Sequence, residues 1–155
     1  MLKTAYIAFG SNLGDSERTV REAYAALGRV PGVFPEALSA LYVTAPWGYA
    51  DQPDFINACA RVRTDRPPEM LLGACLGIEA AFGRERTLKN GPRTLDLDLL
   101  LCEGETRDTP ALRLPHPGLL ERTFVLRPLL DVSPGGFACG MDVAAALEAA
   151  EKAEK

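Results

Sequence analysis

The sequence predicts an α+β fold, a ferredoxin-like sandwich of two split β-α-β units with a mainly antiparallel sheet. Three observations lead to this fold class. Short runs of β-branched, aromatic or alternating residues indicate strands, longer segments carry apolar residues at helical spacing, and the order of these segments is β-α-β-β-α-β. The helices are expected to pack on the sheet, and long loops are expected to carry the functional site. The 155 residues suit a single domain covering 1–155.

The first half of the chain supplies a strand, a helix and two further strands. Residues 4–10 predict the first strand, which a Gly-Ser-Asn turn closes. A helix is expected from a cap at Asp15 or Ser16 to about Val30, where Pro and Gly end the helical pattern. Residues 37–43 and 55–64 predict the next two strands. The eleven-residue loop between them is rich in Pro, Gly and aromatic residues, and loops of this length are often functional.

In the second half of the chain, helices and strands again follow one another. A helix is expected over 67–82, with proline in its first turn, and a strand over 94–102. Residues 103–118 are expected to form a loop. Residues 121–132 predict a helical stretch that Pro128 should break, and residues 141–155 a final helix with a frayed, charged tail.

Composition excludes several classes of protein. Hydrophobic residues make up 47% and charged residues 25%, as in soluble globular proteins, and the net charge of -4 argues against a general nucleic-acid or membrane-surface role. No segment approaches the roughly 20 apolar residues of a membrane span, and the N-terminus does not have the pattern of a signal peptide. We therefore expect a cytoplasmic protein that contacts neither nucleic acid nor membrane.

The four cysteines lack Cys-x-x-Cys spacing, and each has apolar neighbours: Cys59, Cys75, Cys102 and Cys139. We interpret them as small buried side chains in a reducing compartment. The alternative is a zinc or disulfide role.

Two aspartates on the strand at 94–102 pose the main chemical question. Side chains alternate along a strand, so Asp96 and Asp98 share one face while the intervening leucines occupy the other. Their Cα atoms should lie roughly 6.5–7 Å apart, which lets both carboxylates reach one metal ion or a pair of ions. The alternative is an ordinary solvent-facing strand, although like charges on one face repel each other.

A basic loop precedes these aspartates. Residues 83–93 contain three arginines, a lysine and only one acid, and guanidinium groups suit phosphate oxygens. Magnesium normally binds through a few carboxylates plus substrate phosphates, so this combination predicts a Mg-nucleotide site. His116, the only histidine, lies between two prolines that stiffen the backbone, which suits a fixed hydrogen-bond donor to phosphate. A surface histidine is the alternative.

Aromatic residues around 47–57 could form a slot for a flat heterocycle. Trp47 and Phe55 supply rings, and Asn57 can satisfy both a donor and an acceptor edge. The alternative for the rings is the hydrophobic core. Taken alone, Arg122 suggests a surface arginine and Phe124 a core aromatic.

Taken together, these segments resemble the 6-hydroxymethyl-7,8-dihydropterin pyrophosphokinase family. The resemblance is carried by AYIAFGSNLGD at 5–15, YVTAPWG at 42–48, DQPDFINA at 51–58, IEAAFGR at 78–84, GPRTLDLDLLL at 91–101 and LPHPGLLERTFVLRPL at 114–129. It implies a Mg-dependent diphosphokinase of folate biosynthesis, usually monomeric, that transfers pyrophosphate from ATP to the pterin hydroxymethyl group and releases AMP. No side-chain base for the hydroxyl proton is identified.

The resemblance also implies roles for individual residues. Asp96 and Asp98 would ligate two Mg²⁺ ions, and together with Arg84 and Arg93 would be catalytic. The ATP-binding set would be Glu79, Arg84, Arg93, Arg113, His116 and Arg122. The pterin-binding set would be Thr44, Ala45, Trp47, Phe55, Asn57 and Phe124, with the two phenylalanines stacking on the pterin ring.

Two other functions remain as alternatives. A non-catalytic module that senses a nucleotide or metal would not need the full set of phosphate-binding and metal-binding groups. A metal-dependent nuclease built on the aspartate pair would need a broad basic groove, which the net acidity does not favour.

Overall fold

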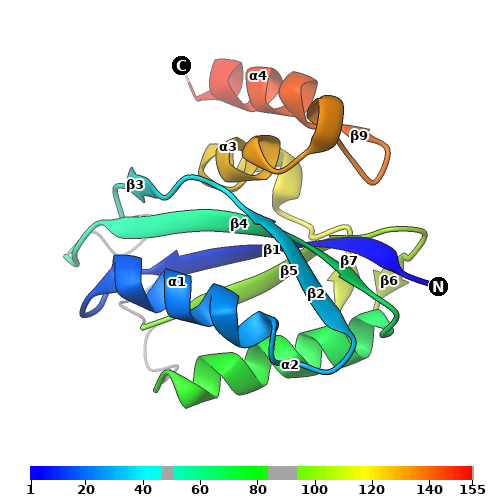
Figure 1. The fold of residues 1–155 in the computed structure, drawn as a ribbon. Helices are drawn as coiled ribbons and strands as arrows, with labels where there is room; N and C mark the ends of the chain where they lie inside the picture. Colours follow the sequence, from blue (N-terminus) through cyan, green and yellow to red (C-terminus); the bar gives the residue numbers. More distant parts are fainter. Residues whose placement is uncertain (47–50, 84–93, 155) are drawn as a thin grey trace.

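The computed structural model describes residues 1–46, 51–83 and 94–154, and its centre is an antiparallel sheet (Figure 1). The strand order is β2-β4-β1-β5, with β3 paired to β4 beyond this path. The strands are β1 (Lys3–Ser11), β2 (Val33–Leu38), β3 (Tyr42–Thr44), β4 (Phe55–Thr64) and β5 (Asp96–Cys102). All their pairings are antiparallel. The order expected for two split β-α-β units is therefore confirmed.

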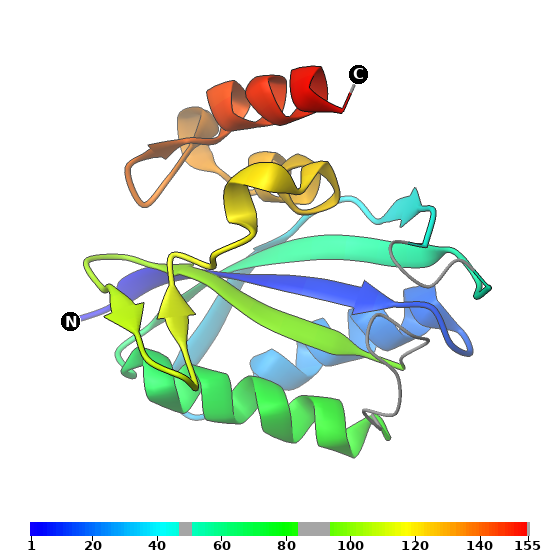
Figure 2. The same cartoon turned by 180° about the vertical axis from the view of Figure 1, so that it is seen from behind.

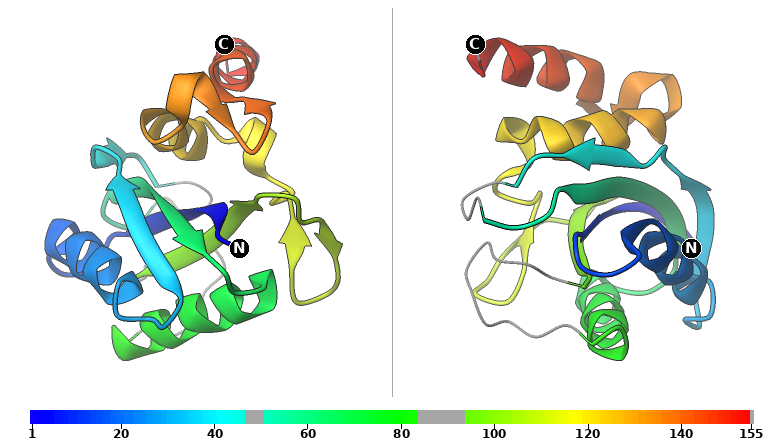
Figure 3. Two further views of the ribbon diagram at one scale, coloured as in Figure 1. Left: turned by 45° about the vertical axis from the view of Figure 1, so that its right-hand side comes forward. Right: turned by 90° about the vertical axis from the view of Figure 1, so that its left-hand side faces the viewer.

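Helices cover both faces of the sheet and form successive layers (Figure 3). The helices are α1 (Ser16–Leu27), α2 (Pro68–Ala81), α3 (Thr123–Asp131) and α4 (Val143–Ala153). Helices α1 and α2 lie on one face, where a core cluster contains Ile7, Leu97 and Leu71. Helix α3 lies on the other face, and α4 packs on the outer side of α3 around Leu126 and Leu129. No helix among the described residues is long and apolar enough to cross a membrane.

Local chemistry fixes the helix starts. The Asp15 carboxylate accepts the Arg18 N–H at 3.2 Å and caps α1, as predicted, and Pro68 opens α2. Helix α1 ends at Leu27, three residues before the expected end, because the chain then turns at Gly28. Val30 still packs against the core from this turn, which explains why its spacing suggested a longer helix.

The single strand expected over 37–43 is wrong, because the structure has two strands there. Strand β2 pairs Leu38 with Ala60, whereas β3 pairs Tyr42 with Asn57, so the register shifts between them. At the break, the Ser39 hydroxyl accepts the Cys59 N–H at 2.8 Å, a position that a backbone carbonyl would take in a continuous ladder. A short polar side chain has thus replaced a ladder bond.

Two other expectations also fail. Residues 103–118 are not only loop, because β6 (Arg107–Asp108) and β7 (Arg113–Leu114) form a small hairpin beside the sheet, visible in Figure 2. Helix α3 runs through Pro128 without a break. Proline removes one backbone hydrogen bond, but the buried side chains of the helix, such as Leu126 and Leu129, hold it in place against the sheet.

The C-terminal part contains a second short hairpin, β8 (Phe137–Ala138) and β9 (Met141–Asp142), before α4. The predicted burial is confirmed for Cys59, Cys75 and Cys102, but it is wrong for Cys139, which is exposed in the β8–β9 turn at a φ of 49°. All four thiols are free.

Candidate functional site

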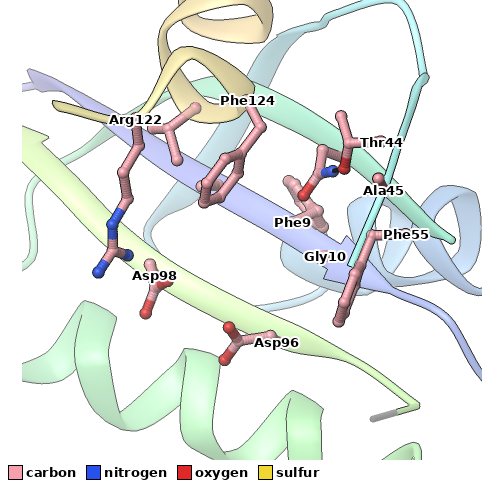
Figure 4. A pocket seen from close by; sticks show the side chains of 12 residues that line it. Phe9, Gly10, Thr44, Ala45, Phe55, Asp96, Asp98, Arg122 and Phe124 are labelled. Carbon is pink, nitrogen blue, oxygen red and sulfur yellow. Dashed lines mark hydrogen bonds between the residues drawn. The ribbon is translucent and has the colours of Figure 1, made fainter. Parts of the chain in front are cut away.

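The strand alternation places the two aspartates as predicted. Leu95, Leu97 and Leu99 point into the core below the sheet, on the α1 and α2 side. Asp96 and Asp98 are half-buried on the opposite face, beneath α3 (Figure 4). The residues paired with them on β1 are Gly10 and Ala8, whose small side chains leave space above the sheet.

That space is a pocket that we call the ring pocket. It is lined by Ala8, Phe9, Gly10, Thr44, Ala45, Phe55, Asn57, Asp96, Asp98, Arg122, Phe124 and Val125. In Figure 4 the rings of Phe124, from the start of α3, and Phe55, from the start of β4, stand on either side of an opening above the aspartates. Five of the six residues expected to bind a pterin therefore meet the aspartate pair in one cavity.

Polar groups in the ring pocket are held in place by hydrogen bonds. Asn57 is 8% exposed, and its Nδ2 donates to the Thr44 hydroxyl at 2.5 Å across the β3–β4 pair. Arg122 extends from the residue before α3 toward the Asp98 side of the pocket (Figure 4). The pocket thus presents aromatic faces, an ordered amide and a guanidinium around two carboxylates.

A second pocket, which we call the hairpin pocket, lies on the other side of Asp98. It is lined by Leu72, Leu97, Asp98, Leu99, Pro110, Ala111, Leu112, Arg113, His116 and Pro117. Apolar side chains from α2 and β5 form one part, and the β6–β7 hairpin with the following loop forms the rest. Asp98 lines both pockets, so the two cavities meet at this carboxylate.

His116 is half-buried and oriented by its neighbours. Its backbone N–H donates to the Leu100 carbonyl at 3.0 Å, and the Gly118 N–H donates to its Nδ1 at 3.2 Å. The acceptor role of Nδ1 leaves the proton of the neutral ring on Nε2. Burial, with a smaller effect from Arg122, lowers the pKa of His116 from 6.5, and Asp96 opposes this shift. The ring is therefore a neutral N–H donor at neutral pH.

Glu79 lies outside the lining of both pockets. Its side chain is 3% exposed, and Oε2 accepts the Leu97 N–H at 2.7 Å. Since Leu97 lies between the two aspartates on the edge strand, this contact supports the strand that carries them. Trp47, Arg84 and Arg93, which the sequence also indicated, lie outside the described residues.

Sequence reasoning missed a contact that ties two loops together. Asn12, in the turn after β1, is 3% exposed and donates from Nδ2 to Gln52 Oε1 at 2.8 Å and to the Pro53 carbonyl at 2.9 Å. This fixes the segment before β4 that leads into Phe55 of the ring pocket. The Gly-Ser-Asn turn was the available signal, but a turn alone does not indicate a partner forty residues away.

The donor set around Asp98 fits a magnesium ion. Within the described part of the chain, no group of three or more His, Cys, Asp or Glu side chains is arranged to hold a metal by itself. Two carboxylates sharing one face match Mg²⁺, which uses one or two carboxylates and completes its shell with water and substrate phosphates. A closed structural zinc site would need four protein ligands.

The model of the 7,8-dihydro-6-hydroxymethylpterin-pyrophosphokinase family matches residues 6–134. Two similar proteins, both named 2-amino-4-hydroxy-6-hydroxymethyldihydropteridine pyrophosphokinase, come from Pseudomonas aeruginosa and Bacillus subtilis. The first is 43% identical over 86% of this chain and 83% of its own length. The second is 43% identical over 85% of this chain and 79% of its own length.

Longer proteins also match. The folic acid synthesis protein fol1 of Schizosaccharomyces pombe is 44% identical over 85% of this chain, which spans only 18% of that protein. A solved structure of HPPK-DHPS in complex with substrates superposes with a TM-score of 0.70 at 14% identity, covering 97% of this chain and 44% of the other. At that identity the likeness shows a shared fold.

Proposed function

The chain belongs to the 7,8-dihydro-6-hydroxymethylpterin-pyrophosphokinase family, and on this basis we propose its reaction. It transfers the pyrophosphoryl group of ATP to the hydroxyl of 6-hydroxymethyl-7,8-dihydropterin, giving AMP and the pterin diphosphate in folate biosynthesis. The observation that carries this proposal is the meeting of two chemically different pockets at Asp98.

The ring pocket suits the pterin. Phe55 and Phe124 provide apolar faces on either side of a flat heterocycle, and aromatic pairs of this kind favour stacked contacts. Asn57 offers its carbonyl to ring N–H groups, because its Nδ2 is already bonded to Thr44. Ala45 leaves room at the pocket edge, and we assign Trp47 to the same site from the family resemblance.

The hairpin pocket suits the nucleotide. Its leucines from α2, β5 and the turn between β6 and β7 can cover the apolar faces of a purine, while His116 and Arg113 lie where phosphates or ribose can be reached. The neutral His116 donates through Nε2–H, and Arg122 donates from the ring-pocket side of Asp98. We assign Arg84 and Arg93 to the phosphates as well, again from the family resemblance, and Glu79 to the support of this region.

Asp96 and Asp98 would hold magnesium, and we propose two ions. Bound there, Mg²⁺ supplies positive charge that offsets the negative charge of the triphosphate oxygens. Both carboxylates line the ring pocket and Asp98 also lines the hairpin pocket, so magnesium held there would place positive charge between the pterin hydroxyl and the phosphates.

The transfer balances as a single displacement. The hydroxymethyl oxygen forms a bond to the β-phosphorus, the bond from that phosphorus to the α,β-bridging oxygen breaks, and AMP leaves with the electron pair. Arg122 and His116 donate hydrogen bonds to oxygens that gain negative charge, and positioning of the two substrates supplies much of the rate. The hydroxyl proton is released to water, which completes the balance.

We further propose that the protein acts as a cytoplasmic monomer built from one domain over 1–155. Three buried cysteines with free thiols support a reducing compartment. ATP and the reduced pterin are then its two partners.

A direct product assay tests the reaction. The protein is incubated with ATP, Mg²⁺ and the hydroxymethyl dihydropterin, and nucleotides are separated over time. AMP that accumulates in step with pterin diphosphate is expected, whereas ADP as product, or the absence of turnover, contradicts the proposal.

The metal assignment has a separate test that does not depend on turnover. At a Mg²⁺ concentration ten times its dissociation constant, the native protein should gain about 1.4 kcal/mol of unfolding free energy. Asp98→Asn should abolish this gain together with AMP formation, while Asp65→Asn, an exposed site beyond β4, should keep both. An undiminished Mg²⁺ effect in Asp98→Asn would exclude the assignment.

A further inference from the structure

The hairpin pocket is bounded by two walls from separate parts of the chain. Leu72 on α2 and Leu99 on β5 belong to the first wall, and residues 110–112 in the turn of the β6–β7 hairpin belong to the second. Figure 2 shows the hairpin beside the first turns of α2, outside the edge strand β5. The width of the pocket therefore depends on how the hairpin is held against α2.

The hairpin has few backbone bonds of its own. Each strand has two residues, and only Arg107 with Leu114 and Asp108 with Arg113 are paired. An isolated ribbon of this size is not stable in water, so tertiary contacts must hold it. Leu112 and Leu114 are buried and anchor β7 to the core, and the Thr109 N–H donates to the Leu112 carbonyl at 3.0 Å across the turn. These bonds hold β6 to β7 but do not join it to α2.

Arg107 joins β6 directly to α2. Its Nε donates to Glu69 Oε2 at 2.6 Å and its Nη2 to Glu69 Oε1 at 3.3 Å, so the pair is bidentate. Its Nη1 donates to Glu105 Oε1 at 3.1 Å, and Lys3 Nζ donates to the other oxygen of Glu105 at 2.6 Å. Lys3, Glu105, Arg107 and Glu69 thus form a continuous ion-pair network with no net charge, which runs from β1 to α2.

The position of Glu69 on the helix connects this ion-pair network to the pocket. Glu69 precedes Leu72 by three residues, and residues at this spacing lie on the same face of a helix. Arg107 therefore holds the hairpin to the helix face that lines the pocket. The hydrogen bond from Arg107 lowers the pKa of Glu69, and those from Lys3 and Arg107 lower the pKa of Glu105, so both carboxylates stay ionised at neutral pH.

We propose that Arg107 is a positioning residue for the nucleotide, which sets the width of the hairpin pocket by clamping the β6–β7 hairpin to α2 through Glu69. This inference rests on the proposed function, which places ATP in that pocket. The four side chains are partly exposed, and exposed ion pairs add little to global stability. Their loss should therefore affect nucleotide binding more than folding.

The test measures ATP binding and catalysis in the same variants. For Arg107→Gln we expect the dissociation constant of ATP with Mg²⁺, measured by calorimetry without pterin, to rise about three- to tenfold, the scale of losing an ordered ion-pair network. The KM for ATP should rise in parallel, while kcat and the KM for the pterin should stay within about twofold. Arg107→Lys keeps the positive charge but not the bidentate contact of the guanidinium, so its ATP dissociation constant should lie between those of the native protein and Arg107→Gln.

A matched control removes an ion pair of similar exposure elsewhere. Arg61 on β4 contacts Glu36 on β2 at 3.1 Å, near the opposite edge of the sheet. Arg61→Gln should leave the affinity for ATP unchanged. If Arg107→Gln does not fold, Glu69→Gln breaks the same clamp from the helix side and should give the same rise in the ATP dissociation constant.

The outcomes separate the clamp from the reaction. Unchanged ATP affinity in Arg107→Gln, or an equal rise in KM for both substrates, would overturn the clamp. If the native protein binds ATP and the variant binds it more weakly, but no AMP forms with the pterin, the clamp stands and the proposed reaction fails.

Discussion

Replacing Glu79 with alanine should loosen the strand that carries both aspartates. Among the described residues, strand β5 is at the edge of the sheet, with β1 as its one strand neighbour. The Leu97 N–H has its acceptor in the Glu79 carboxylate, at 2.7 Å, and the side chain of Glu79 is 3% exposed. Glu79→Ala leaves this buried N–H without its acceptor and without ready access to water.

The expected loss follows from the hydrogen bond. A buried donor deprived of its partner costs about 1–3 kcal/mol, so we expect Glu79→Ala to lower the free energy of unfolding by about 2 kcal/mol. Glu79→Gln keeps a carbonyl acceptor for the Leu97 N–H but replaces a charge-assisted bond with a neutral one, which should cost about 1 kcal/mol.

Urea unfolding and amide hydrogen exchange check this together. Both variants should unfold at lower urea concentrations than the native protein, and the midpoint of Glu79→Ala should be lower than that of Glu79→Gln. The Leu97 amide should exchange faster in Glu79→Ala, whereas Glu36→Ala, which removes an exposed carboxylate on β2, should leave that amide unchanged. Unaltered Leu97 exchange in Glu79→Ala would refute the reasoning, whatever the change in global stability.

Two further predictions concern titratable side chains. Burial and Arg122 lower the pKa of His116 in the folded protein despite the opposing effect of Asp96, so the unfolded chain binds the proton more readily and stability should fall as the pH drops below 6.5. His116→Gln should flatten that part of the stability-pH curve, and an equal slope in both proteins would contradict the prediction. Cys139, the exposed cysteine, should alone of the four thiols react with a thiol reagent in the native protein. The reaction should be slow at pH 8, because partial desolvation of its sulfur by neighbouring groups raises its pKa to about 11. Labelling of a second thiol before unfolding would count against this.

Local patterns predicted the regular elements wherever one face of an element is buried. Strands β1 and β4 and helix α2 match their expected ranges closely, because alternation and helical spacing both record which side meets the core. The break between β2 and β3 depends on one hydroxyl, that of Ser39, bonding across to β4. The two-residue strands of the β6–β7 hairpin are too short to show any periodicity.

The site was predictable in part for the same reason. Alternation alone placed Asp96 and Asp98 on one face, but it could not decide between a metal site and a solvent face. The contribution of Phe124 depends on how α3 packs over the sheet, and that of His116 on the loop after the β6–β7 hairpin. These placements join residues far apart in the chain. The flanking prolines suggested a phosphate contact for His116, but only the resemblance to a family indicated that Phe124 belongs to the site.

The edge position of β5 explains why one carboxylate can serve two cavities. On the side of β1 the space above Asp98 continues over Ala8 and Gly10 into the ring pocket, while on the open side of β5 it continues toward Leu112 and His116. If β5 were a central strand, another strand would occupy the side away from β1, where the hairpin pocket lies. The strand order β2-β4-β1-β5 therefore forms the core and also places β5 at the edge of the described sheet. At this edge, the substrate that accepts the pyrophosphoryl group in one pocket and the nucleotide in the other can meet at Asp98.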